Sequence, residues 1–235
     1  MKKKYLTVVA ILFITFQLNA ESAINYLTRY GRLDQLKDLL ELGSNPNEYD
    51  DFLEGETPLM TSMYVPANFN NTPDGFYEER REVVALLLDF KANPNLLSKK
   101  KNESPLTVAI RKRAISIVEL LLSKGANPNL SVVNNLYDIY PAGSSPLHVA
   151  SYSEGSDKIS PEIVRILIKF GGKVNSFDKN KNTPLHIIAK EGNYSIAEIL
   201  VENGANKKAK NKEGKTPFEI ALSAGRIELA KLLKE

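Results

Sequence analysis

The chain of 235 residues contains no cysteine and only two histidines. Without cysteine the protein can form no disulfide and can hold neither a thiol nucleophile nor a cysteine-bound metal. Two histidines alone make a poor metal site, because a protein zinc site uses three or four ligands. The sequence also lacks a phosphate-binding glycine loop and an H-E-x-x-H pair. These absences argue against an enzyme, and we expect no catalytic residue, metal or cofactor.

A short motif recurs along the chain, in which Ser or Thr is followed by Pro and then by Leu or Phe. A run that is apolar at helical spacing follows each copy. The copies begin at Thr57, Ser104, Ser145, Thr183 and Thr216. Their starts lie 47, 41, 38 and 33 residues apart. A second signature alternates with the first, and its copies begin at Gly43, Lys91, Gly125, Gly171 and Gly204. Such self-similarity indicates a repeat protein.

The copy that begins at Thr183 shows how one unit is built. Thr183 is a candidate N-cap, and Pro184 suits the first helical position because no donor is needed there. Gly192 divides the following residues into two predicted helices, and Gly204 suits the left-handed cap of the second. Their apolar positions are Leu185, Ile188, Ala189, Ile196, Ile199 and Leu200. One such pair cannot bury its apolar face alone, so the units must stack.

The closing interval of 33 residues, with Thr-Pro-Leu-His opening a helix pair, matches the period and pattern of ankyrin repeats. From about Ser22 to its end, the chain therefore resembles the ankyrin repeat family. The resemblance implies an all-α repeat fold, an ankyrin solenoid of about six helix-turn-helix units with projecting β-hairpin loops. It also implies that His148 and His186, fourth in their tetrapeptides, make hydrogen bonds that tie the loops together. The units fall at about residues 21–50, 51–97, 98–138, 139–177, 178–210 and 211–235.

Three stretches exceed the length of the repeat and are predicted to be loop insertions. They cover about residues 63–78, 130–143 and 152–160. The first contains Tyr64, Phe69, a predicted turn at 70–75, Phe76 and Tyr77, and the second contains Leu136, Tyr137, Ile139 and Tyr140. Aromatic side chains in exposed loops are good anchors for a partner. The alternative is that these loops have drifted freely and that their aromatics fold back over a helix end.

Residues 1–20 have the features of a secretory signal peptide. Three lysines follow Met1, the run 6–16 is apolar, and Ala20 precedes the expected cleavage point. The run is short for a bilayer span, so we expect no stable membrane anchor after cleavage, a retained anchor being the alternative. Residues 21–235 would then form the mature repeat domain. The short leader is typical of bacteria, and the predicted location is the periplasm or the exterior of the cell.

The formal net charge of +3 belongs to the leader, since the remaining residues hold 28 basic and 28 acidic side chains. The charges are nevertheless separated along the chain. Residues 21–91 carry a net charge of −8 and residues 92–235 carry +8. Such a field can steer and orient a charged partner, and it weakens with salt.

The resemblance implies binding through the loop tips and the exposed side of each first helix, which line a concave face. Alignment of the motifs places nine candidate residues there: Lys99, Lys100, Lys179 and Lys212 on loops, and Tyr64, Arg111, Lys112, Tyr152 and Lys190 on first helices. This mostly basic surface predicts an acidic protein partner, and a merely solvated face is the alternative. Changing Lys99, Lys100, Arg111 and Lys112 together to Glu is expected to abolish partner capture while leaving the melt nearly unchanged.

The sequence thus predicts a non-catalytic protein–protein interaction module, an exported monomer that binds a protein through its concave, partly basic face. One alternative is a binder of an anionic envelope component. Another is an inhibitor or immunity protein for a secreted enzyme. Export from the cytoplasm argues against a nucleic-acid partner, although lysine clusters can neutralise phosphates.

Overall fold

A computed structural model describes residues 22–50, 55–64, 73–134, 136–137, 139–152 and 160–234. The predicted signal peptide lies outside these residues. The chain divides into two compact units, Met1–Ala126 and Asn127–Glu235. The first unit holds helices α2 (Ala23–Arg29), α3 (Leu33–Glu41), α4 (Pro58–Thr61), α5 (Pro73–Asp89), α6 (Pro105–Arg111) and α7 (Ile115–Ser123). The second holds α8 (Pro146–Val149), α9 (Pro161–Lys169), α10 (Pro184–Glu191), α11 (Tyr194–Glu202), α12 (Pro217–Ser223) and α13 (Ile227–Leu233).

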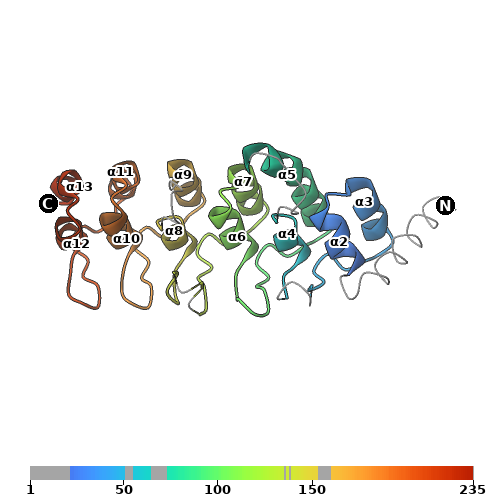
Figure 1. Cartoon of the computed structure of the whole chain (residues 1–235), viewed down its shortest axis with the longest axis horizontal. Helices are drawn as coiled ribbons and strands as arrows, with labels where there is room; N and C mark the ends of the chain where they lie inside the picture. The colour runs from blue at the N-terminus through green and yellow to red at the C-terminus, as the bar shows by residue number, and fades with distance from the viewer. Residues whose placement is uncertain are drawn as a thin grey trace. The chain divides into compact units, whose positions relative to one another are not determined.

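The helices of each unit are stacked in two rows. In the first unit α2, α4 and α6 contact one another in sequence, and α3, α5 and α7 form the second row. In the second unit α8, α10 and α12 form the first row, and α9, α11 and α13, drawn above them in Figure 1, form the second. Within each unit the connecting loops project on the side of the first helices (Figure 1). The described part of the chain contains no extended strand, and its two isolated β-bridges join Asp50 to Glu56 and Leu136 to Tyr140.

Each first helix from α4 onward begins where the sequence predicts, at a proline preceded by Ser or Thr. At the start of α12, Thr216 Oγ1 accepts a hydrogen bond from the Glu219 amide at 3.3 Å. The Glu219 carboxylate accepts one from the Thr216 amide at 2.7 Å. This reciprocal pair satisfies two amides that a helix start leaves free. Hydrogen bonding to the charged form lowers the pKa of Glu219.

The apolar faces of the helix pairs form the core. The six apolar residues predicted to be buried in the unit that begins at Thr183 are all buried, with Leu185 fully inaccessible. Leu185 lies on α10, which contacts both α11 and α12. The core is therefore shared between neighbouring helix pairs, as a stacked repeat requires.

We expect Leu185→Ala to lower the free energy of unfolding by about 2 to 5 kcal/mol, because it empties a core site between packed helices. The control is Leu222→Ala, since Leu222 is 52% exposed on α12. The control should change stability by no more than about 0.5 kcal/mol. Urea melts measure both variants, and equal midpoints for the two would show that Leu185 is not in a shared core.

Both histidines tie neighbouring loops of the second unit together. His148 Nδ1 accepts from the Ser145 amide at 3.1 Å, which places its proton on Nε2, and Nε2 then donates to the Asn182 carbonyl at 2.9 Å. His186 makes the equivalent bonds, from the Thr183 amide at 3.1 Å and to the Lys215 carbonyl at 3.2 Å. The predicted hydrogen-bonding role is confirmed. Burial lowers the pKa of both imidazoles, so they are neutral at pH 7.

These lowered pKa values predict a loss of stability in mild acid. As pH falls below the ordinary histidine pKa of 6.5, the unfolded chain binds protons that the folded chain does not. Unfolding is therefore favoured, and the melting temperature should fall between about pH 7.5 and 5.5. The double variant His148→Gln and His186→Gln should lose most of this dependence in the same scan. A melting temperature that is flat over this range in the unmodified protein would contradict the prediction.

The insertions differ in part from their predictions. Residues 73–78 belong to the long helix α5, so the turn predicted at 70–75 is wrong from Pro73 onward. Proline is favoured in the first turn of a helix, and here it starts one. Tyr77 is buried in α5 and is not a loop anchor, whereas Phe69 and the side chain of Phe76 lie outside the described part of the structure. Of the insertion 152–160, residues 153–159 also lie outside it. Among the helices described, none is long and apolar enough to cross a membrane.

Candidate protein-binding surface

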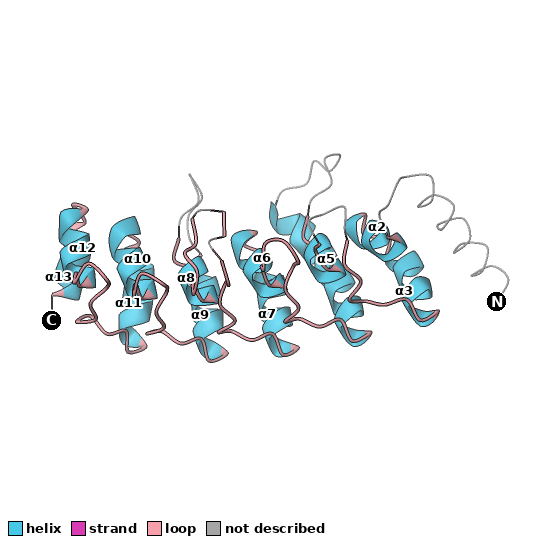
Figure 2. Cartoon of the chain, turned by 90° about the horizontal axis from the view of Figure 1, so that it is seen from below, coloured by secondary structure: helices cyan, strands magenta, loops and turns pink. Residues whose placement is uncertain are grey.

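Three of the predicted loop lysines hold equivalent places in their loops. The backbone amide of Lys99 donates to the Gly55 carbonyl at 2.9 Å in the first unit. In the second unit Lys179 donates to Ala142 at 2.8 Å, and Lys212 donates to Asn180 at 2.9 Å. Each bond joins a loop to the preceding loop of the same unit. Figure 2 views the loops of each unit from below. The three lysine side chains are exposed while their backbones are fixed.

A polar side chain at the base of each loop fixes its turn. Asp178 Oδ1 accepts from the amides of Asn180 and Asn182, both at 2.8 Å. Asn211 Oδ1 does the same in the next loop, accepting from the amides of residues 213 and 215 at 3.0 Å. Such side-chain-to-backbone bonds are the usual way in which Asp and Asn stabilise turns. The loops that carry the candidate lysines are therefore held in defined positions.

In the first unit, the predicted binding residue Arg111 forms a buried ion pair. Its Nε lies 2.7 Å and its Nη2 3.3 Å from the two carboxylate oxygens of Glu103. The Glu103 side chain is 1% exposed and the Arg111 side chain 11%. Arg111 is thus committed to holding α6 against the loop before it. The expectation that reversing its charge leaves the melt unchanged does not fit this geometry.

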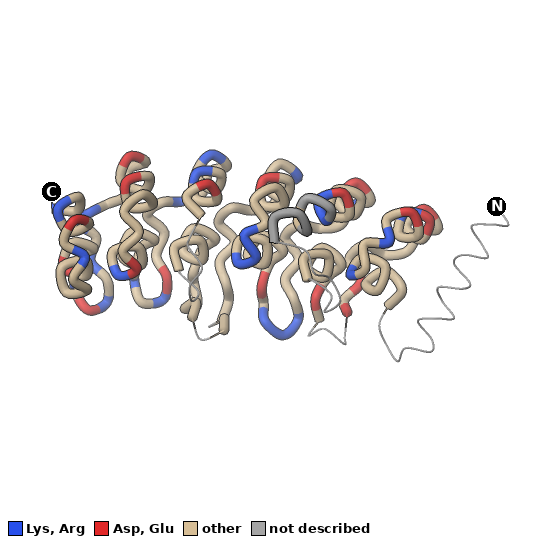
Figure 3. The backbone as a smooth tube through the Cα atoms, turned by 45° about the horizontal axis from the view of Figure 1, so that its top comes forward, with Lys and Arg blue, Asp and Glu red and all other residues tan. Residues whose placement is uncertain are grey.

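Other candidates of the first unit contact neighbouring side chains. The Lys112 ammonium lies 5.1 Å from the centre of the Tyr64 ring, and the Tyr64 hydroxyl donates to Glu56 Oε1 at 2.8 Å. The Lys99 ammonium lies 4.7 Å from the centre of the Tyr49 ring. These are cation–π contacts within the unit. Lys100 remains exposed within the basic loop tip before α6 (Figure 3).

Because Arg111 neutralises a carboxylate that is almost inaccessible, Arg111→Met should destabilise the protein by about 3 to 5 kcal/mol. The control Lys100→Met removes an exposed charge from the preceding loop and should alter stability by less than about 0.5 kcal/mol. Urea denaturation distinguishes the two. Equal stabilities would show that the Glu103 carboxylate does not depend on its arginine partner.

In the second unit, three predicted residues line one groove. The groove has a volume of about 620 Å³ and lies along α10, α12 and the loops before them. Tyr152, Lys190 and Lys212 border it. Lys179, the fourth candidate of this unit, is exposed but does not line the groove. Further lining residues are Ile139, Asn180, Ile187, Glu191 and Ile220, of which sequence reasoning missed Ile187 and Ile220.

The groove combines apolar walls with exposed charge. Lys215 pairs with Glu213 at 3.0 Å. Lys190 and Lys212 make no ion pair with any described residue. Figure 3 shows acidic and basic positions together on the loops before α10 and α12. The arrangement suits a partner surface with both apolar and charged groups.

Tyr152 forms one wall of the groove and is held from behind. Its ring packs edge-on against Tyr140, with 5.2 Å between ring centres. Burial raises the pKa of Tyr152, and the nearby Asp178 and Glu191 carboxylates add to this effect, so the phenol is neutral. Tyr152 therefore offers a fixed apolar ring and a hydroxyl that can donate a hydrogen bond. Across the described residues, no group of three or more His, Asp and Glu side chains could hold a metal ion.

The repeat pattern and this architecture agree with a sequence family. The family model described as ankyrin repeats (3 copies) matches residues 23–132, 77–178, 128–211 and 147–235. The chain belongs to the ankyrin repeat family, and its predicted fold class, an all-α ankyrin repeat solenoid, is confirmed. Ankyrin repeats are protein-interaction modules and are generally non-catalytic.

Individual relatives are larger proteins. Mouse ankyrin repeat and MYND domain-containing protein 1 is 31% identical over 134 residues, and these cover 54% of this chain and 14% of the mouse protein. Mouse palmitoyltransferase ZDHHC13 is 31% identical over 199 residues, covering 73% of this chain and 29% of the enzyme. The chain therefore spans less than a third of either relative.

A solved structure resembles almost the whole chain. It contains the predatory endopeptidase Bd0816 from Bdellovibrio bacteriovorus in complex with the immunity protein Bd3460. One of its chains matches with a TM-score of 0.70 and 23% identity, covering 92% of this chain and 98% of that one. At 23% identity this likeness shows a shared fold only.

Proposed function

We propose that this chain is a non-catalytic module that binds a protein partner through the loop and first-helix face of its second unit. The observation that carries the proposal is the groove along α10 and α12. Its lining combines apolar side chains, among them Ile139 and Ile187, with the exposed ammonium groups of Lys190 and Lys212. Its loops are fixed to one another by backbone hydrogen bonds. A fixed concave surface binds with little loss of conformational entropy, which suits recognition.

The partner is proposed to be acidic where it meets this face. Lys190 and Lys212 have no ion-pair partner among the described residues, and Lys179 stands exposed on the neighbouring loop. A carboxylate placed near these ammonium groups would form charge-assisted hydrogen bonds. We propose further that the protein acts after export, as a monomer, and the signal-peptide pattern of residues 1–20 supports this location.

Inhibition of a secreted enzyme is a second candidate function. The solved complex that matches this chain pairs an endopeptidase with an immunity protein, and the matched chain is covered almost completely. A repeat stack of this size could bind across an enzyme surface without contributing any catalytic group. This candidate is a special case of protein binding and shares the same proposed surface.

Affinity capture from a native extract tests the proposal. The double variant Lys190→Glu and Lys212→Glu should lose a protein that the unmodified chain retains, because both groove ammonium groups become carboxylates. The matched control is Arg165→Glu with Lys169→Glu, which reverses two exposed charges on the second-row helix α9. Thermal melts confirm that both variants fold. Equal capture by the groove variant and the unmodified chain would move the binding surface elsewhere.

The alternatives give different results in the same experiment. An anionic polymer would be retained without protein specificity, and its binding would fall steeply with salt. If a secreted enzyme is captured, equimolar addition of this chain should suppress that enzyme's activity, and the groove variant should not. Capture without any loss of activity would exclude the inhibitor role and leave protein binding intact.

A further inference from the structure

The insertion at 130–143 is a built loop of the second unit. The Val132 amide donates to the Ser144 carbonyl at 2.9 Å, and the Gly143 amide donates back to Val132 at 2.8 Å. At its far end, Leu136 and Tyr140 exchange two backbone hydrogen bonds of 2.9 and 3.0 Å. The side chains of Leu136 and Tyr140 are each only 2% exposed. The four backbone bonds therefore fix the shape of the loop, and the two buried side chains hold it to the unit.

This anchored loop presents apolar side chains outward. Tyr137 is 39% and Ile139 is 42% exposed, although they lie between the two buried anchors. The backbone of Tyr137 has φ of +53°, a left-handed conformation that a bulky side chain rarely adopts. Strain of this kind persists only where the surroundings hold it, and it is often found at binding sites. Exposed apolar groups on a fixed loop favour contact with another molecule.

The loop and the groove meet at Ile139. Ile139 lines the groove together with Tyr152, which packs against the buried anchor Tyr140. The same groove is bordered by Lys190 and Lys212. Its lining also includes Asn180, whose side-chain amide makes no hydrogen bond to a described residue. An amide can both donate to and accept from a peptide backbone.

We propose that the groove takes a short extended protein segment in which an apolar side chain packs on Ile139 and Tyr152 and an acidic side chain meets Lys190 and Lys212. The inference rests on the proposed function and names the chemistry of what that site binds. Charge complementarity selects the acidic group. The apolar wall of Ile139 and Tyr152 adds a second requirement, because the bound segment must also carry an apolar side chain. The groove volume of about 620 Å³ lies in the range of pockets that enclose small ligands, and it can admit a few side chains.

Selection of random decapeptides displayed on phage, against the full chain, tests this inference. Peptides that bind the unmodified protein should be enriched in an apolar residue close to an acidic one. Their synthetic forms should bind Ile139→Ser at least about tenfold more weakly, since burial of an isoleucine contributes more than the 1.4 kcal/mol that a factor of ten represents. The variant Lys190→Glu with Lys212→Glu should lose the acidic preference. The α9 variant Arg165→Glu with Lys169→Glu should bind as the unmodified chain does.

Several results would overturn the inference. Failure to enrich any peptide would exclude a short extended segment, and equal binding by Ile139→Ser would exclude the apolar contact. A concentration-dependent dimer that Ile139→Ser abolishes would show that a second copy of the chain covers the loop. The proposed function is judged separately by protein capture. If capture depends on the two lysines and peptide binding does not depend on Ile139, only the present inference fails.

Discussion

A single helix pair cannot bury its apolar surface alone, so it must stack on a neighbouring pair. The structure depends on the hydrogen bonds that hold each pair to the next. The last asparagine of the second repeated signature, whose copies begin at Gly43, Lys91, Gly125 and Gly171, supplies one such lock within each unit. Asn175 Oδ1 accepts from the Asn206 amide at 2.7 Å, and its Nδ2 donates to the Gly204 carbonyl at 2.8 Å. Asn129 makes equivalent bonds in the second unit, and Asn47 makes them in the first. The signature therefore recurs because each neighbour needs its asparagine.

The opposite edge of each stack is locked by the loops, and this lock fixes the proposed binding surface. Histidine rings and backbone amides connect successive loops of the second unit, so the lysines on those loops are displayed from a fixed frame. The exposed ends of these side chains are free to vary without disturbing the frame. Lys212 therefore stabilises the frame through its bonded backbone, while its exposed ammonium group is left for the proposed recognition.

The sequence predicted the fold well because periodic apolar residues and proline-marked helix starts are local signals. It placed Tyr152, Lys190 and Lys212 on one face because repeat alignment reports the place of a residue within its unit, and all three line one groove. Tyr152 was expected on a first helix but lies beyond the end of α8. The sequence could not show that Arg111 pairs with Glu103, since that contact depends on how the preceding loop turns. The sequence also assigned Ile139 to an insertion but could not say which residues it lies beside, because that too depends on how the loop turns. Its place in the groove follows from the anchors around it, which no repeat pattern encodes.

The insertion at 63–78 shows how two local signals can conflict. The run from Asn70 to Gly75 has the composition of a turn, yet Pro73 begins α5, and the buried Tyr77 follows in that helix. Burial along an extended second helix outweighed the local turn preference. A turn preference is read from each residue separately, whereas the burial of a residue depends on the neighbouring helices that cover it.

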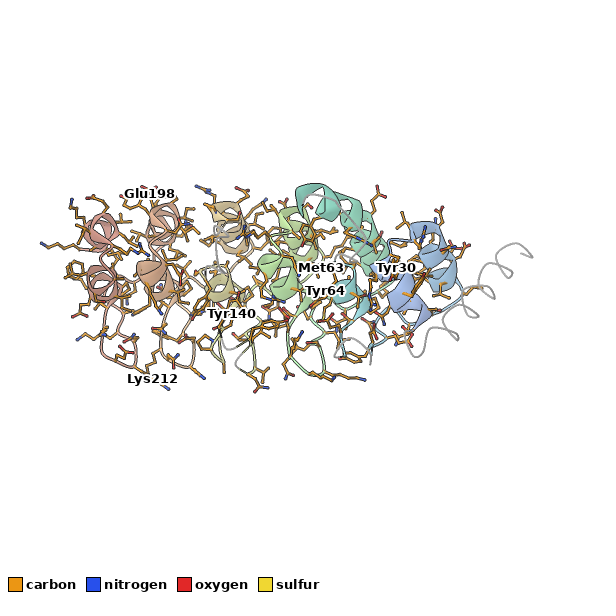
Figure 4. The ribbon with its side chains drawn as sticks, in the orientation of Figure 1. Tyr30, Met63, Tyr64, Tyr140, Glu198 and Lys212 are labelled. Carbon is orange, nitrogen blue, oxygen red and sulfur yellow. The ribbon has the colours of Figure 1, made fainter. Side chains whose placement is uncertain are left out.

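Photo-crosslinking in the native cell would test the central claim, that the loop and first-helix face of the second unit meets a protein. A photoreactive residue would replace Lys212 on that face in one variant and the exposed Glu198 of α11 in the other. These two residues lie on opposite sides of the second unit (Figure 4). We expect a discrete protein adduct from position 212 and none from position 198. An adduct from position 198 alone, or from neither position, would contradict it.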